Sequence, residues 1–344
     1  MFSLFTNQFV LAASVSPKTQ TVAKKIDFYQ IENYILPNSN KALITEKDLY
    51  ELLPYSIDLA RNEIYARHGY IFKNDYYSDY FGSKPWYKKN INFKETLLSS
   101  LEKKNALFLK SYSDKLKTNF KKVEGNKLLT DLNGDGKKDS VKLDCISGSD
   151  EYTLTVNNSS ISGTGCNMDG VMYIFDIDIK DKYKEIAISE SGPSSDNCTY
   201  LYYYNGNKLI FMGRVEGSDY ALKISGSGTF TTKTRGNLLQ TWFYTDQYKL
   251  SSSHKLVHIP HKLYKMNTFV TLKIQLKLHK SPTDMSTALV LKPGEKVLIT
   301  DTDNKKWCAI ETSKGVKGWF AVGNFGDING KIGSDIFDGL CYAD

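Results

Sequence analysis

The sequence predicts a multidomain α+β protein: a small helical domain, then an all-β sheet or sandwich domain, and last a small β-barrel. Three observations lead to this prediction. The chain has 344 residues, more than a single hydrophobic core usually serves. Apolar residues recur at helical spacing over residues 37–118. Short alternating runs separated by turn residues follow over 119–267 and 268–344, and they predict strands.

The composition excludes several classes of protein. With 41% hydrophobic and 24% charged residues, the chain is not disordered as a whole. No apolar run approaches the roughly 20 residues that span a bilayer, so we expect no transmembrane segment. The net charge of +7 is spread along the chain. Because nucleic-acid binders concentrate basic charge on one face, we expect no nucleic-acid partner.

The N-terminal segment predicts export from the cell. Residues 1–16 carry no charge and end in small residues, as the apolar and cleavage regions of a secretory signal do. No cation precedes the apolar stretch, so we interpret it as a truncated signal sequence; the alternative is a plain apolar N-terminus. Residues 17–36 are predicted to be a linker. We therefore expect the protein to be secreted or at the cell surface.

The five cysteines leave two alternatives open. They lie far apart and form no Cys-x-x-Cys pair, which excludes the usual zinc and thioredoxin spacings. In an exported protein, Cys308 and Cys341 could form a disulfide in the C-terminal domain, and two of the other three cysteines could pair in the middle, which would leave one free. The other alternative is five reduced thiols that pack as small hydrophobic groups.

The first domain, residues 37–118, is predicted to consist of three or four short helices. Thr45 to Asp48 has the form of a capping box. Ser56 is expected to open the next helix, and Gly69 is expected to end it in a left-handed conformation. A longer amphipathic helix is predicted between residues 97 and 116, after a connection rich in aromatic residues.

This domain resembles a known family. The run from Arg61 to Tyr70, followed by Phe72, Tyr80-Phe81 and Trp86-Tyr87, resembles the YARHG domain, which is named for the residues found here at 65–69. The resemblance covers about 80 residues and implies an extracellular bacterial module with no settled activity. The candidate ligand-binding residues of this domain are Arg61, Glu63, Arg67, His68, Trp86 and Tyr87.

These charged residues have two interpretations. Arg67 could clamp a carboxylate or phosphate of a cell-wall fragment, beside two aromatic rings. Alternatively, Glu63 and Arg67 pair four residues apart as part of a buried network, while His68 meets the carbonyls at the helix C-terminus. The second interpretation is favoured, because an acid, a base and an imidazole without a nucleophile are usually structural.

A loop near residue 135 predicts a structural Ca²⁺ site. Oxygen-bearing side chains occur at its positions 1, 3, 5 and 9, and glycine at position 6 permits a tight turn. Lys142 replaces the glutamate that an EF-hand needs, and a strand follows, so the loop resembles those of integrin-type β-repeats. An ion-free hairpin with Asx turns is the alternative. The predicted ligands are Asp131, Asn133, Asp135, the Lys137 carbonyl and Asp139.

The β domain contains two further candidate metal sites, and neither is expected to hold an ion. Residues 175–188 form a degenerate second copy of the loop, predicted to be a hairpin without the ion. His254, His258 and His261 lie close in sequence, but Pro260 prevents a helix and no acidic residue is near. We therefore expect packed or solvated histidines and no zinc.

The C-terminal domain, residues 268–344, contains five predicted short strands, as expected for a small barrel. Its turns at Lys292–Val297 and Gly315–Trp319 resemble those of bacterial Src-homology-3-like domains, which implies binding of wall peptides or a spacer role. Trp307 and Trp319 are candidates for stacking on a ligand, although core burial is the commoner outcome. Residues 324–344 are predicted to be an acidic, glycine-rich tail.

Together these features predict a non-catalytic, modular binding or scaffold protein of the bacterial cell envelope, stabilised by Ca²⁺. Its expected partner is a cell-wall polymer or peptide. The chain shows no catalytic constellation at a recognisable spacing. A hydrolase that acts on wall or peptide material is the alternative, and a secreted inhibitor or regulator is another.

Overall fold

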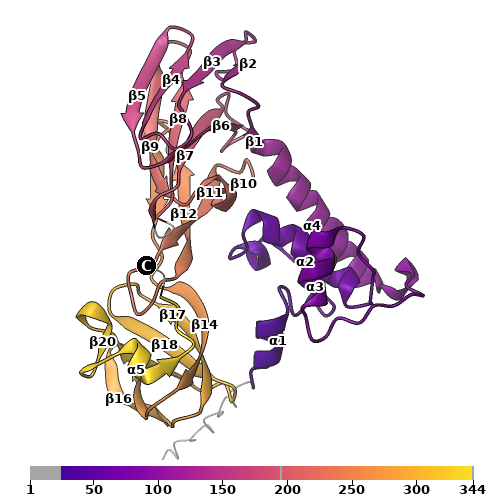
Figure 1. Cartoon of the computed structure of the whole chain (residues 1–344), viewed down its shortest axis with the longest axis vertical. Coiled ribbons are helices and arrows are strands. Elements are labelled where there is room, and N and C mark those ends of the chain that lie inside the picture. Colours follow the sequence, from indigo (N-terminus) through magenta and orange to yellow (C-terminus); the bar gives the residue numbers. More distant parts are fainter. Residues whose placement is uncertain (1–24, 194–195, 343–344) are drawn as a thin grey trace, which may run out of the picture.

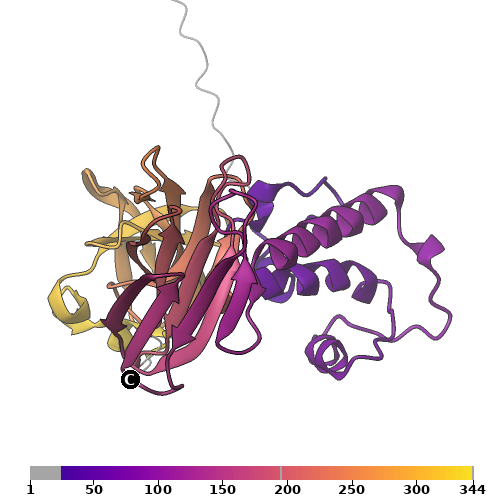
Figure 2. The same cartoon turned by 90° about the horizontal axis from the view of Figure 1, so that it is seen from above.

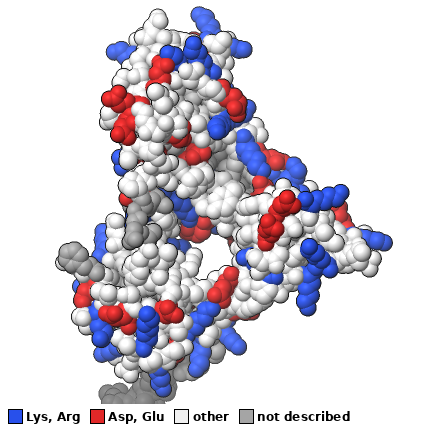
Figure 3. All heavy atoms as spheres, viewed as in Figure 1, with Lys and Arg blue, Asp and Glu red and all other residues white. Residues whose placement is uncertain are grey.

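A computed structural model describes residues 25–193 and 196–342, and it arranges them in three parts around a common opening (Figures 1 and 3). A helical part lies on one side, a stack of β-sheets at one end of the long axis, and a curved β-sheet at the other end (Figures 1 and 2). No helix in the described ranges combines the length and apolarity that membrane crossing requires. The predicted signal sequence, residues 1–16, lies outside the described residues.

The helical part confirms the predicted short helices. The elements are α1 (Phe28–Asn33), η1 (Glu46–Leu49), α2 (Pro54–Ala66), α3 (Asp75–Gly82), η2 (Glu95–Leu97) and α4 (Ser100–Asn119). The capping box of Thr45 and Asp48 begins η1, as predicted. Helix α2 begins at Pro54, earlier than expected, because proline suits a first helical turn. Gly69 has φ +82°, and an added Cβ would lie 2.5 Å from the Lys88 carbonyl oxygen.

Residues predicted to be a linker contribute to this part. Helix α1 lies within the range 17–36, and Asp27 caps it by accepting a hydrogen bond from the Gln30 amide. The chain then extends through Ile35 and Leu36 and packs against the helical core. The linker prediction therefore needs correction for residues 25–36, where the helix cap and the packing of apolar side chains order the chain.

The β domain is a stack of three antiparallel sheets, so the predicted sheet or sandwich has an extra layer. The first sheet contains β2 (Lys127–Thr130), β3 (Asp139–Asp144), β4 (Glu151–Val156) and β5 (Ser159–Thr164). The middle sheet has the order β1 (Lys121–Lys122), β6 (Met168–Phe175), β7 (Glu185–Glu190), β8 (Cys198–Tyr204) and β9 (Leu209–Glu216). The third contains β10 (Lys223–Ile224), β11 (Thr229–Arg235), β12 (Phe243–Leu250) and β13 (Leu256–Ile259).

The middle sheet is buried on both faces, which explains its nearly continuous apolar strands. Ile186 and Ile188 of β7 face the first sheet, whereas Ala187 between them faces the third sheet. Alternate residues of one strand thus serve two cores. The degenerate loop copy connects β6 to β7, and these strands pair antiparallel, so the predicted second hairpin is confirmed.

The C-terminal part is a curved, half-barrel sheet. Its strand order is β16 (Asp284–Leu291), β15 (Leu276–Ser281), β19 (Lys317–Ala321), β18 (Trp307–Thr312), β17 (Lys296–Thr302), β14 (Tyr264–Leu272) and β22 (Phe337–Asp338). The smaller elements are η4 (Asp219–Ala221) in the β domain, then η5 (Asn324–Gly326), β20 (Asp327–Ile328), β21 (Lys331–Ile332) and α5 (Gly333–Ile336). Strand β14 begins before the predicted domain boundary at residue 268.

The predicted C-terminal tail is part of the half-barrel. Ile328, Ile336 and Phe337 are buried in its core, and β22 pairs with β14. The sequence prediction is wrong here because polar and glycine residues surround the few apolar ones that pack. All five cysteines are free, with Cys308 buried and Cys341 exposed, so the structure has the reduced-thiol alternative and no Cys308–Cys341 disulfide.

Specific contacts join the three parts. The buried ammonium of Lys223 in β10 donates hydrogen bonds to the carbonyls of Leu49, Tyr50 and Leu52, where η1 ends. On the other side, Glu32 of α1 accepts two hydrogen bonds from the Lys296 ammonium of the half-barrel, both 2.8 Å. The helical part therefore contacts both β parts, which closes the arrangement seen in Figures 1 and 3.

Candidate functional site

The loop between β2 and β3 contains the predicted Ca²⁺ ligands. Asp131 accepts hydrogen bonds from the amides of Asn133, Gly134 and Gly136, at 3.2, 2.7 and 2.9 Å. Although desolvation acts in the opposite direction, these amides lower the pKa of Asp131. Asp135 accepts a hydrogen bond from the Lys137 amide, at 2.8 Å. These are the contacts of the Asx-turn alternative.

Asn133 and Asp139 are the buried members of the predicted ligand set. The Asn133 side chain accepts a hydrogen bond from the Asp135 amide, at 3.0 Å. The two carboxylate oxygens of Asp139 accept hydrogen bonds from Leu132 and Asn157, at 2.9 and 2.8 Å. The oxygen donors suit Ca²⁺ chemically, but no three His, Cys, Asp or Glu side chains in the described ranges are placed to hold a metal ion. Ca²⁺ binding stays a prediction.

The loop packs on its degenerate copy. Gly134 has φ +67°, and a Cβ there would lie 2.8 Å from both the Cβ and the carbonyl oxygen of Lys182. The Lys184 amide donates a hydrogen bond to the Leu132 carbonyl, at 2.9 Å. Gly134, at position 4 of the loop, therefore permits close contact between the two hairpins, whereas Gly136, the glycine at position 6, has open space around it.

The YARHG-like residues form a network around a buried carboxylate. Glu63 of α2 is 1% exposed and accepts hydrogen bonds from the amides of Ile35 and Leu36, at 2.7 and 3.3 Å. The Arg67 guanidinium lies 2.6 Å from Glu63 and also donates to the Leu36 carbonyl, at 2.9 Å. Burial raises the pKa of Glu63, although Arg67 and the two amides act against this.

The aromatic candidates complete this network. The guanidinium of Arg67 lies 4.3 Å from the ring centre of Tyr34, and Tyr34 stacks on Trp86 at 4.9 Å. The Trp86 indole donates a hydrogen bond to the Asn33 carbonyl at the end of α1, at 3.0 Å. Arg67 and Trp86 thus hold the segment 33–36 between them.

The remaining candidates of this domain have separate contacts. His68 lies 2.9 Å from Glu102 of α4, instead of meeting helix carbonyls as the second interpretation expected. Burial opposes ionisation of Glu102, but hydrogen bonds with His68 and Ser99 lower its pKa overall. Arg61 lies over the Tyr65 ring at 5.8 Å, and the Tyr87 hydroxyl donates a hydrogen bond to the Tyr70 carbonyl at 2.7 Å.

Comparison with known families supports the resemblance in this part of the chain. Residues 32–114 match the family model described as the YARHG domain. This part of the chain is a YARHG domain. No curated protein and no solved structure gives a significant match. Within the YARHG domain, the motif residues Glu63 and Arg67 contact the chain that links it to α1, so their partners are internal.

The three histidines do not converge. His254 lies 2.7 Å from the buried Glu185 carboxylate, and His258 lies 2.7 Å from Asp246. The side chain of His261 contacts the Tyr50 hydroxyl of the YARHG domain at 2.8 Å. His254 is packed and His258 is exposed, in line with the expected packed or solvated histidines. The expectation that no acidic residue is near is wrong, because Glu185 and Asp246 contact two of them.

The two tryptophans of the half-barrel are half-buried and lie outside its core. Core residues Cys308 and Phe320 point inward, whereas their neighbours Trp307 and Trp319 point to the other face of the sheet. His279 lies beside Trp307, with ring centres 6.3 Å apart, and is paired in register with Trp319. The expectation of core burial is therefore wrong for both.

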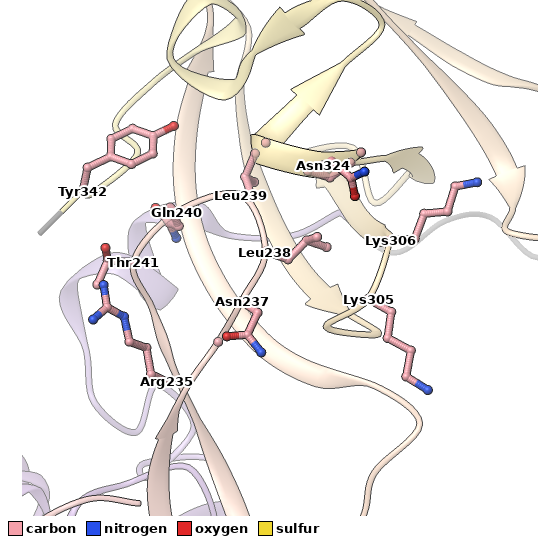
Figure 4. Close-up of a pocket in the computed structure, with 14 residues that line it drawn as sticks. Arg235, Asn237, Leu238, Leu239, Gln240, Thr241, Lys305, Lys306, Asn324 and Tyr342 are labelled. Atoms are coloured by element: carbon pink, nitrogen blue, oxygen red, sulfur yellow. The ribbon is translucent and has the colours of Figure 1, made fainter. Parts of the chain in front are cut away.

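A cavity of about 830 Å³ lies between the β domain and the half-barrel, and we call it the polar cleft. Its residues come from the β11–β12 loop, the β17–β18 turn, the segment after β19 and the C-terminal segment (Figure 4). They are Arg235, Gly236, Asn237, Leu238, Leu239, Gln240, Thr241, Lys305, Lys306, Val322, Gly323, Asn324, Gly326 and Tyr342.

The charge of the polar cleft is positive. Three cations and three carboxamides line it, and none of its described lining residues has a carboxylate, although Asp196 lies 2.9 Å from Arg235 at its edge. Figure 4 shows Arg235 and Tyr342 on one side of the β11–β12 loop, with Lys305 and Lys306 on the other. The cations are therefore spread along the cleft, which suits an extended chain of negative charges better than a single anion.

The β11–β12 loop is held firmly in the polar cleft. The Asn237 amide donates a hydrogen bond to the Asn304 side chain, and the Cys341 amide donates one to the Gln240 side chain, at 2.8 and 2.9 Å. Leu239 has φ +73°, a conformation that costs a leucine about 1 kcal/mol or more. This cleft could not be predicted from the sequence, because the adjacent Lys305 and Lys306 are its only local signal.

Proposed function

We propose that the protein is a non-catalytic, secreted or cell-surface binding protein of the bacterial cell envelope, and that the polar cleft binds an anionic wall polymer. The observation that carries this proposal is the set of spread cations, Arg235, Lys305 and Lys306, in a cavity of about 830 Å³. Carboxylate or phosphate groups along a polymer would meet these cations in succession. The YARHG domain supports an extracellular location, since such domains are typically extracellular.

The proposal assigns supporting roles to the other parts. The YARHG domain acts as a scaffold that joins α1 to the β domain, and Ca²⁺ in the β2–β3 loop stabilises the first sheet. The half-barrel, which resembles Src-homology-3-like domains in its turns, supplies one wall of the polar cleft. A hydrolase is the alternative function, and it would need a reactive group within reach of the bound polymer.

Retention on purified bacterial cell walls tests the proposal. We expect the protein to sediment with intact walls, and to sediment less after their anionic polymers are extracted. Retention should fall as salt rises from 50 to about 500 mM, because the screening length for exposed charges shortens from roughly 14 Å to roughly 4 Å over this range. Lys305→Ser/Lys306→Ser should weaken retention about tenfold, because each lost charge contact is worth roughly 0.5–1 kcal/mol.

The control is Lys314→Ser/Lys331→Ser, which removes two exposed lysines of the half-barrel outside the polar cleft. This variant has the same net charge as the test variant and should be retained like the wild type. Equal losses in both variants would contradict specific binding in the cleft. Release of soluble wall fragments would favour the hydrolase instead.

A further inference from the structure

A second cavity lies where the YARHG domain meets the β domain, and we call it the tyrosine chamber. It has a volume of about 450 Å³, within the range of small-ligand sites. The start of α2 and the end of α4 form one wall, and η4 with β10 forms the other. Its floor is apolar: Leu116 of α4 packs in the helical core, and Leu222 and Ile224 pack in the core of the middle and third sheets.

Two exposed tyrosines stand at the tyrosine chamber. Tyr55, near the start of α2, is 52% exposed, and Tyr220 of η4 is 54% exposed. They belong to different domains, and both line the same cavity. Exposed rings beside an apolar floor offer flat surfaces on which a ligand can stack.

The charges of the tyrosine chamber balance. Asp58 of α2 accepts hydrogen bonds from Ser113 and Lys117 of α4, at 2.7 and 2.6 Å. Lys122 and Asp219 supply one further charge of each sign. The chamber therefore selects neither anions nor cations, in contrast to the polar cleft, while its charged groups can donate and accept hydrogen bonds.

We propose that the tyrosine chamber binds a neutral carbohydrate, with sugar rings stacked on Tyr55 and Tyr220 and hydroxyl groups bonded to the surrounding Asp and Lys side chains. A sugar has an apolar C–H face and a polar edge, which matches aromatic rings bordered by balanced charges. A purely apolar ligand would leave these charges without new partners, and an anionic ligand would meet Asp58 and Asp219. The proposal does not depend on wall-polymer binding in the polar cleft.

Titration calorimetry of the full chain with chitotetraose, and separately with maltotetraose, tests this proposal. We expect at least one of the two oligosaccharides to bind with a Kd of roughly 10 μM to 1 mM, as a shallow site with few contacts allows. Tyr55→Ala and Tyr220→Ala should each weaken binding about tenfold, because each loses a stacking contact. Tyr55→Phe keeps the ring and should retain binding within about twofold.

Tyr29→Ala is the matched control, since Tyr29 is 48% exposed on α1, outside the chamber. It should bind like the wild type, and thermal melting will show that all variants are folded. Absence of binding for both sugars at 10 mM would overturn the proposal, as would equal affinity in Tyr55→Ala and the wild type. Loss of wall retention in Lys305→Ser/Lys306→Ser with sugar affinity unchanged would separate this site from the polar cleft.

Discussion

Glu63 and Arg67 serve as internal attachment points for the chain that precedes the YARHG motif. Glu63 accepts hydrogen bonds from the backbone amides of Ile35 and Leu36, and Arg67 donates a hydrogen bond to the Leu36 carbonyl. A buried carboxylate is costly unless such partners satisfy it. The spacing of four residues on a helix predicted their pairing. It did not predict the bound segment, Ile35 and Leu36, which lies about 30 residues away in sequence.

Arg67→Ala is expected to destabilise the protein by about 3–5 kcal/mol, because it leaves Glu63 buried without its cation. The control is Arg61→Ala on the same helix. The Arg61 guanidinium lies over the Tyr65 ring, and its loss should destabilise the protein by less than about 1 kcal/mol. Urea denaturation of both variants measures these changes. Similar losses of stability in the two variants would show that the Glu63–Arg67 pair contributes no more to folding than Arg61 does.

The β2–β3 loop illustrates how an element can have two roles. Its side chains bond the loop amides, and its glycine at position 134 allows the second hairpin to approach. The sequence predicted the hairpin and its turn because both follow from local spacing. The carboxylate oxygens that accept hydrogen bonds from the loop amides are the same ones that would coordinate Ca²⁺, so their remaining lone pairs must point toward the ion.

We expect Ca²⁺ to raise the melting temperature, since a ligand at 100 times its Kd stabilises the folded state by about 2.7 kcal/mol. Asp135→Asn keeps an acceptor for the Lys137 amide but removes one charge, so the rise should shrink. Asp144→Asn in β3, with an exposed carboxylate, is the control. Scanning calorimetry with Ca²⁺ and with a chelator measures these melting temperatures. A wild-type melting temperature that is the same in both would refute the Ca²⁺ site.

The contact between η1 and β10 depends on a buried lysine. Lys223 is 7% exposed and donates to three carbonyls at the end of η1. Lys233 of β11 lies nearby and donates to the Glu51 carbonyl and Thr245 hydroxyl, at 3.0 and 2.6 Å. Burial, and secondarily Lys233, lower the pKa of Lys223 to about 7, although Glu51 opposes this.

Because the pKa of Lys223 is lowered in the folded state, its contribution to the free energy of unfolding should increase as the pH rises. Between its folded pKa of about 7 and the usual lysine value of about 10.4, the unfolded chain binds a proton that the folded chain has released. The stability difference between wild type and Lys223→Met should grow by about 2 kcal/mol, in favour of wild type, from pH 7 to 9. Lys249→Met, an exposed lysine of the same sheet, is the control. A difference that stays constant in urea denaturation across this range would contradict the prediction.

Helix α1 completes the closed arrangement of the three parts, because it contacts the half-barrel and leads into the YARHG domain. Phe28 packs edge-on against Phe269 of the half-barrel, with ring centres 5.1 Å apart, and Glu32 pairs with Lys296. Residues 35 and 36 then lead directly to Glu63 and Arg67. A short segment thus connects the half-barrel to the YARHG motif, across the opening visible in Figure 3.

Phe28→Ala/Glu32→Ala should open this closed arrangement. We expect small-angle scattering to give a larger radius of gyration, while the melting temperature changes by only a few degrees, because the Glu32–Lys296 pair is half-exposed and worth less than about 1 kcal/mol. Tyr29→Ala on the same helix serves as the control. An unchanged scattering curve would show that other contacts hold the three parts together.

The sequence by itself determined the local structure: capped helices, the YARHG motif, the hairpins and the strands of the half-barrel, because each depends on residues close together in the chain. Only the tertiary structure decided the third sheet layer, the packing of residues 327–337, the partners of the three histidines and both cavities. Several of these features join residues more than 50 positions apart, such as Tyr55 with Tyr220 or Arg235 with Lys305. Such contacts arise from packing of whole elements, which local patterns of hydrophobicity and charge do not encode.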